Sequence, residues 1–255
     1  MTTRLPSTGA APFEAPAATC RSDEVVVVHR LFKRLFADAP DIVRGVEVGD
    51  TVRAKRVAKH LHGITKLLHV HHRTEDAYFW DTMTDRTPSC GLHVALMRTQ
   101  HERVSDLLDV VDERIDEWTP DADLASAERL ALELEEVNQL LLVHLADEER
   151  EAFPILDEIL TDAEWDRVHR KAQGHLPPLP LFVLVGFMLE SVPPAERDHW
   201  FATQMPAPIR VAYRAVGRKQ YEHALAGLFP ERAQRTRRST PRPPRGIRPL
   251  TPRTA

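Results

Sequence analysis

Cysteine is scarce in this chain, and its scarcity removes several classes of protein from consideration. Only two cysteines occur among 255 residues, Cys20 and Cys90, and neither has a second cysteine at metal-site spacing or a nearby activating motif. A disulfide-stabilised scaffold and a thiolate metal site are therefore excluded. We expect both cysteines to be reduced thiols in a cytoplasmic protein.

Long apolar runs and the common catalytic motifs are also absent. No stretch approaches the roughly 18 consecutive apolar residues that cross a bilayer. The first twenty residues contain Pro6, Pro12, Glu14 and Pro16 where a signal peptide needs an apolar core. No glycine-rich phosphate loop, Ser-x-x-Lys motif or nucleophile elbow occurs. We expect no membrane association, no export and a cytoplasmic location.

Glycine is sparse as well, and the prolines lie mostly outside long segments of helical periodicity. Ten glycines and twenty prolines, with 42% hydrophobic and 28% charged residues, fit a soluble all-α chain. The periodicity predicts four long helices over residues 22–38 (or on past Pro40 to 44), 51–83, 91–118 and 122–152. Shorter helices are expected over residues 161–173, 179–191, 193–205 and 208–229.

These segments predict four regions. Residues 1–20 form a disordered leader, 21–160 an up-down-up-down four-helix bundle, 161–230 a helical C-terminal extension, and 231–255 a basic disordered tail. The tail has eight arginines and one glutamate, whereas the preceding residues have 26 basic and 37 acidic side chains. Because the tail has no aromatic residue to stack on a base, we expect no specific nucleic-acid binding.

Two of the long segments carry a histidine four residues before a glutamate. His71 precedes Glu75 and His144 precedes Glu148, a spacing that places both side chains of a pair on one helical face. Each pair lies on an apolar stripe, so both should point into the bundle. Glu149 is the alternative to Glu148, but it lies about 100° further round the helix.

Each of the other two long segments places one histidine on its own apolar stripe. His29 lies among valines and phenylalanines, and His101 among valines, Met97 and Leu108. Burying these imidazoles and carboxylates without compensation would cost several kcal/mol per charge, and metal cations are the simplest compensation. Imidazole and carboxylate donors suit iron, manganese or zinc. The predicted ligands are His29, His71, Glu75, His101, His144 and Glu148.

The other polar residues near these segments are not predicted to bind the metal. We expect surface or outer positions for four other histidines: His60, His62, His69 and His72. Tyr78 is expected to pack in the core, although it could donate a hydrogen bond to a bound oxygen species. Asp76 and Asp147 are expected on solvated helix faces.

At the six predicted ligands the chain resembles the hemerythrin family, and more closely its broad HHE cation-binding branch. The resemblance rests on a histidine on the first helix, His-x-x-x-Glu on the second, a histidine on the third and His-x-x-x-Glu on the fourth, over roughly residues 22 to 160. It implies a centre of two iron ions with an oxo or hydroxo bridge, manganese or zinc being less favoured, in which Glu75 and Glu148 bridge. No catalytic residue separate from the metal site is expected.

The third helix departs from the oxygen-carrying hemerythrins, which place two histidines there one turn apart. Met97 lies a turn before His101 and Ser105 a turn after it, so the six residues supply at most about eight bonds to two ions that together take about twelve. An open centre favours reaction with peroxide, dioxygen or nitric oxide, and hence an oxidative-stress role, over protected oxygen binding. The alternatives are a redox or iron sensor that binds a protein partner through the C-terminal helices, and an oxygen or iron store.

Overall fold

The computed structural model describes residues 21–173 and 179–230, and every regular element in these residues is helical. The predicted leader and tail, residues 1–20 and 231–255, lie outside the described residues. The all-α fold class is confirmed. None of the described helices is both long enough and apolar enough to cross a membrane.

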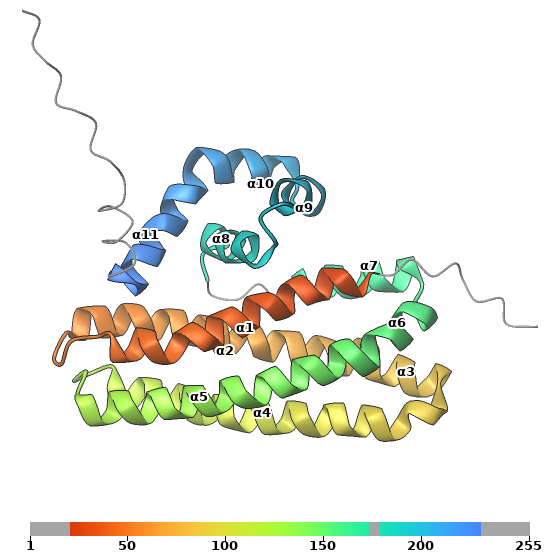
Figure 1. Cartoon of the computed structure of the whole chain (residues 1–255), viewed down its shortest axis with the longest axis horizontal. Helices are drawn as coiled ribbons and strands as arrows, with labels where there is room; N and C mark the ends of the chain where they lie inside the picture. The colour runs from red at the N-terminus through yellow and green to blue at the C-terminus, as the bar shows by residue number, and fades with distance from the viewer. Residues whose placement is uncertain (1–20, 174–178, 231–255) are drawn as a thin grey trace, which may run out of the picture.

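Four long helices form the bundle (Figure 1). Short connections reverse the chain between them, and each helix packs against the next while the first also packs against the last, which closes an up-down-up-down ring. Their bounds are α1 (Ser22–Arg44), α2 (Thr51–Glu75), α4 (Gly91–Trp118) and α5 (Leu124–Asp147). Asp50 and Asp123 cap α2 and α5 by accepting hydrogen bonds from backbone N–H groups of the first turn.

Two of these helices continue through one turn of π-helix. After α2 come η1 (Asp76–Trp80) and α3 (Asp81–Arg86), and after α5 come η3 (Glu148–Ala152) and α6 (Phe153–Ile159). We expected the fourth long helix to end near Ala152, before Pro154, but it runs on to Ile159. Pro154 lies in the first turn of α6, where a missing N–H is tolerated because the wide turn precedes it.

The first helix is likewise uninterrupted at Pro40, so it ends at Arg44 rather than Asp38. A 3-10 turn, η2 (Pro88–Cys90), leads into α4. Beyond the bundle, α7 (Asp162–Gln173) closes one end: the Trp165 ring stacks on Phe79 with centroids 5.7 Å apart, and its Nε1 donates to Glu24 at 3.0 Å.

The remaining helices form a layer over α1 and α2 (Figure 1). They are α8 (Leu181–Ser191), α9 (Arg197–Gln204), α10 (Ala207–Ala212), η4 (Tyr213–Gly217) and α11 (Arg218–Leu228). Phe187 of α8 and Tyr221 of α11 belong to the same buried cluster as the bundle core, and an Arg34–Glu190 ion pair joins α1 to α8.

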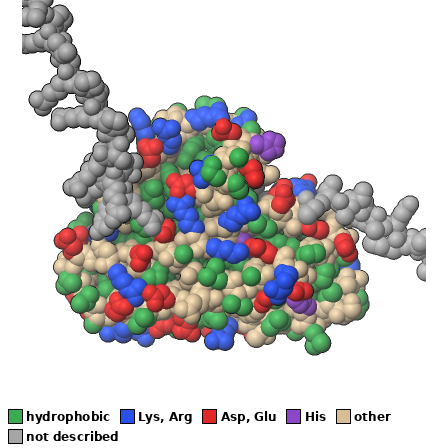
Figure 2. Space-filling model, in the orientation of Figure 1, with side chains coloured by type: hydrophobic (Ala, Val, Ile, Leu, Met, Phe, Trp, Pro, Cys, Tyr) green, Lys and Arg blue, Asp and Glu red, His purple; other side chains and the backbone are tan. Residues whose placement is uncertain are grey.

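The surface of the molecule mixes both signs of charge. On the face in Figure 2, acidic and basic side chains are interspersed and histidine is visible in only a few small places. Most histidines of the long helices are instead buried.

Candidate metal centre

Seven buried or nearly buried side chains from the four long helices meet in the bundle interior. They form two groups, in each of which one ligand atom per residue lies within 4.8 Å of the others. The first group contains His29, His71, Glu75 and Glu148, and the second contains His72, His101 and His144. The structure therefore brings all six predicted ligands to one place and adds His72.

The two carboxylates lie between the two groups. Glu75 Oε1 is 3.2 Å from His71 Nε2, and its Oε2 is 3.7 Å from His101 Nε2. Glu148 Oε2 is 3.4 Å from His29 Nε2 and 3.7 Å from His144 Nε2. Each carboxylate thus faces a histidine of both groups.

Ten atoms of this cluster are buried and have no hydrogen-bond partner in the part of the chain that the structure describes. They are Nε2 of His29, His71, His101 and His144, both ring nitrogens of His72, and both carboxylate oxygens of Glu75 and Glu148. Buried polar atoms are normally paired, and an unpaired one costs roughly 1–3 kcal/mol. Such a set of inward lone pairs, all of nitrogen and oxygen, suits metal cations of the borderline class.

Outer hydrogen bonds fix the orientation of three imidazoles. Nδ1 of His29 lies 2.9 Å from Glu149, Nδ1 of His101 lies 2.9 Å from Asp76, and Nδ1 of His144 lies 3.0 Å from the Gln100 side-chain oxygen. These acceptors assign the ring proton to Nδ1 and leave Nε2 free to bind an ion.

The structure gives two of these acceptors a role other than the one expected from the sequence. Asp76 was expected on a solvated face, but it contacts His101. Glu149, the alternative to Glu148, binds His29 and Lys33 from outside the cluster, whereas Glu148 is fully buried within it. Asp147 accepts a hydrogen bond from Gln100 at 3.1 Å and so supports His144 indirectly.

Burial shifts the protonation of the cluster toward neutral forms. Desolvation lowers the pKa of His29, His71 and His72, and lowers that of His144 to about 2. These imidazoles are therefore neutral, the form that binds metal.

The two carboxyl groups are shifted in the opposite direction. Desolvation raises the pKa of Glu75 well above its ordinary range and that of Glu148 to about 8. By contrast, the pKa of Glu149 is lowered to about 2: hydrogen bonds from His29 and Lys33 outweigh its desolvation. The buried carboxylates need a positive charge to be ionised at neutral pH, and metal cations would supply it.

Both carboxylates of the cluster lie at a π-helical turn. Glu75 is the last residue of α2 before η1, and Glu148 is the first residue of η3. A π turn inserts one residue and changes the direction of the side chains that follow, and such turns are frequent at functional sites. The spacing of four residues identified both glutamates, but nothing in the sequence indicated the wide turns.

The expected surface or outer position of His72 is wrong. His72 is 4% exposed and its ring stacks on His101 with centroids 4.2 Å apart. His72 lies off the apolar stripe of α2. Because the cluster contains two groups of side chains, it takes residues of α2 from a wider arc than the apolar stripe alone. Met97 is fully buried in an apolar cluster, and the Ser105 hydroxyl lies 3.5 Å from Nδ1 of the partly exposed His69.

Of the other histidines that were expected at surface or outer positions, two lie at the surface and one lies in the core. His62 and His69 are partly exposed and contact aspartates of α4, as expected. His60 is 6% exposed and packs beside Phe187, so the expectation of a surface or outer position is wrong for it too. Tyr78 packs against an apolar cluster, as expected.

Comparison with protein-family models gives a match over the bundle. A family model described as the hemerythrin HHE cation-binding domain matches residues 21–156, more than half of the chain. The matched region spans α1 to α6 and contains all seven side chains of the cluster. Neither the curated proteins nor the solved structures include a match.

Proposed function

Because the chain belongs to the hemerythrin HHE cation-binding domain family, we propose that it is a non-haem di-iron protein that binds and reacts with a small oxidant. The oxidant is peroxide or dioxygen, with nitric oxide as an alternative ligand. One observation carries the proposal: two adjacent groups of buried or nearly buried imidazoles, whose inward nitrogens have no partner among the described residues, face two shared carboxylates.

The residues present fit two ions. His72, His101 and His144 would hold one ion, His29 and His71 would hold the other, and Glu75 and Glu148 would bridge them. Support for bridging comes from the short distances between each carboxylate and histidines of both groups. The absence of a thiolate and the presence of imidazole and carboxylate favour iron, with manganese or zinc less favoured.

The number of donors leaves coordination positions for an exogenous molecule. Five imidazoles and two bridging carboxylates supply about nine bonds, against about twelve for two octahedral ions. The His29 and His71 group has one imidazole fewer than the other, so an ion held there would have one more coordination position open. Iron supplies the redox chemistry when bound.

The rest of the site restricts access by water. Phe153 lies beside His29 with ring centroids 5.2 Å apart, and Phe32 lies 5.1 Å from the His71 ring. On the opposite side, the Trp80 ring is 5.8 Å from His101. These aromatic walls favour a small uncharged oxidant over larger or charged substrates.

Anaerobic reconstitution tests the proposal. The purified chain should take up about two ferrous ions, and its optical absorption should change on addition of oxygen, peroxide or nitric oxide. Catalytic loss of peroxide at the loaded protein would establish turnover. A chain that holds neither iron nor another metal in stoichiometric amount under these conditions would refute the proposal.

A second function, reversible dioxygen binding, is favoured by His72. The objection to an oxygen carrier was a missing histidine on the third helix, and His72 of α2 supplies a fifth imidazole to the cluster. Repeated cycles of oxygenation and deoxygenation without oxidation of the iron would select the carrier. Rapid irreversible oxidation, with peroxide consumed, would select the enzyme.

A further inference from the structure

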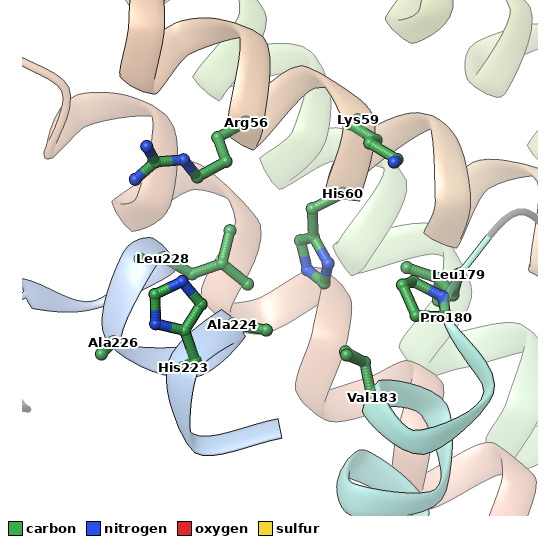
Figure 3. Close-up of a pocket in the computed structure, with 11 residues that line it drawn as sticks. Arg56, Lys59, His60, Leu179, Pro180, Val183, His223, Ala224, Ala226 and Leu228 are labelled. Atoms are coloured by element: carbon green, nitrogen blue, oxygen red, sulfur yellow. The ribbon is translucent and has the colours of Figure 1, made fainter. Parts of the chain in front are cut away.

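A cavity separate from the metal centre lies between α2 and the C-terminal helices α8 and α11 (Figure 3). Its volume is about 510 Å³, which is within the range of small-molecule sites. One side is apolar and is formed by Leu179, Pro180, Val183, Ala224 and Leu228. The cavity can therefore accept an apolar body of moderate size.

The opposite side is formed by α2 and is cationic. Lys59 and His60 lie three and four residues after Arg56, so both are neighbours of Arg56 on one side of α2. Among the described residues, no aspartate or glutamate lines the cavity, and neither Arg56 nor Lys59 has an ion-pair partner. His223 of α11 adds a further nitrogen donor at the rim.

His60 is the polar group deepest in this cavity. The residue is 6% exposed, its ring points between α8 and α11, and in the described part of the chain it makes no hydrogen bond (Figure 3). Its packing against Phe187 holds the ring in place. Desolvation lowers the pKa of His60 to about 4, so at neutral pH the imidazole carries one N–H donor and one acceptor.

We propose that this cavity binds an amphipathic carboxylate of the fatty-acid class. The apolar chain lies against Leu179, Val183 and Leu228, and the carboxylate accepts hydrogen bonds from His60 and from Arg56 or Lys59. The neutral His60 donor satisfies a buried carboxylate oxygen, and the two cations balance its charge. The proposal is independent of the metal centre, because His60 lies eleven residues, or about 16 Å along α2, from His71.

Titration calorimetry on the full iron-loaded chain tests this site. Decanoate should bind saturably at one molecule per chain, decanol more weakly, and acetate not at all. Hexanoate and tetradecanoate, one shorter and one longer than decanoate, test which length of hydrocarbon chain the cavity accepts. Absence of saturable binding by all three fatty acids would overturn the proposal.

Matched variants locate the site. R56Q/K59Q should weaken decanoate binding by about tenfold or more, whereas K55Q/R103Q, which removes two exposed charges elsewhere, should leave it unchanged. Ala224→Trp fills the cavity and should abolish binding, while the helical content and iron content report that the variant is folded. Equal decanoate affinity in R56Q/K59Q, Ala224→Trp and the parent chain would overturn the proposal, since binding would then be elsewhere.

Discussion

At the scale of single residues, adjacent histidines on one helix have different surroundings but a common role in the cluster. His71 and His72 are about 100° apart around α2, so only one of them can lie at the centre of an apolar stripe. His71 faces His29 and Phe32, while His72 faces His101 and His144. A site for two ions is wide enough to use both rings.

Substitution of His72 should weaken the binding of one of the two proposed ions and not of the other. We expect His72→Gln to lower the iron content below two ions per chain, because the second group loses one of the three nitrogen donors proposed to hold its ion. Elemental analysis after anaerobic reconstitution measures the change. His69→Gln, on the same helix but partly exposed, is the control and should retain both ions. Full iron loading in His72→Gln would show that His72 is not a ligand.

Glu149 should tune metal affinity without binding a metal. Its carboxylate accepts a hydrogen bond from His29 Nδ1–H at 2.9 Å, and loss of such a contact typically costs 10–100-fold in affinity. We therefore expect Glu149→Gln to weaken iron binding by about that factor in a chelator competition, with unchanged stoichiometry. Glu151→Gln, at a half-exposed position paired with Arg150, should have no effect. Complete loss of iron in Glu149→Gln would instead make Glu149 a ligand.

His60 should make stability depend on pH. Its pKa is about 4 in the folded chain and about 6.5 when unfolded, so the unfolded state binds more protons between these values. His60 therefore imposes no penalty above about pH 6.5 and destabilises the fold progressively as pH falls toward 4, despite the nearby Asp38 carboxylate.

Urea unfolding of metal-free protein measures this effect. The loss of unfolding free energy between pH 7 and pH 4 should be smaller in His60→Gln than in the parent chain, by on the order of 2 kcal/mol. His199→Gln is a control at a histidine of α9 that is remote from the bundle core. Identical pH profiles for His60→Gln and the parent chain would contradict the low pKa.

At the scale of elements, helical periodicity predicted where helices lie better than how they continue. The long helices begin within about two residues of the expected positions, because caps and apolar stripes are local properties, whereas the fourth runs past its expected end to Ile159. The π turns at η1 and η3 were not predicted, since they depend on how Glu75 and Glu148 fit among the other three helices. Pro154 predicted that the fourth helix would end, but the helix continues because the wide turn of η3 precedes the proline.

The packing of α8 on α11 depends on one glycine. A Cβ atom at Gly186 would collide with the Tyr221 ring, whereas one at Gly91 would meet nothing within 4 Å. We expect Gly186→Ala to destabilise the packing of residues 181–228 on the bundle by about 1–3 kcal/mol, detected as faster hydrogen exchange and proteolysis there. Iron content should not change. Gly91→Ala is the control, and equal protection of α8 and α11 in both variants would contradict the expected collision.

At the scale of the whole molecule, the proposed ions connect every helix of the bundle. The cluster takes side chains from α1, α2, α4 and α5, so metal binding would stabilise the folded bundle relative to the unfolded chain, where these residues are far apart. The C-terminal layer instead packs on α1 and α2 through apolar contacts and the Arg34–Glu190 ion pair, and none of these contacts among the described residues involves the cluster.

Metal removal should therefore lower the stability of the bundle. At free iron about one hundred times its Kd, the stabilisation is about 3 kcal/mol, and a chelator should remove it. Thermal unfolding with and without chelator under anaerobic conditions measures the difference. Magnesium, which prefers oxygen ligands, is the control and should not restore the midpoint. An unfolding midpoint unaffected by iron would contradict a centre shared by four helices.

The sequence by itself determined the helices, the bundle and six of the seven side chains of the cluster. Helix formation depends on local periodicity, and His-x-x-x-Glu places both of its side chains on one face of any helix. Only the tertiary structure decided the position of His72, the roles of Glu149 and Asp76, and the cavity beside His60. Each of these depends on which helices meet, because a side chain is buried or paired by residues distant in the chain.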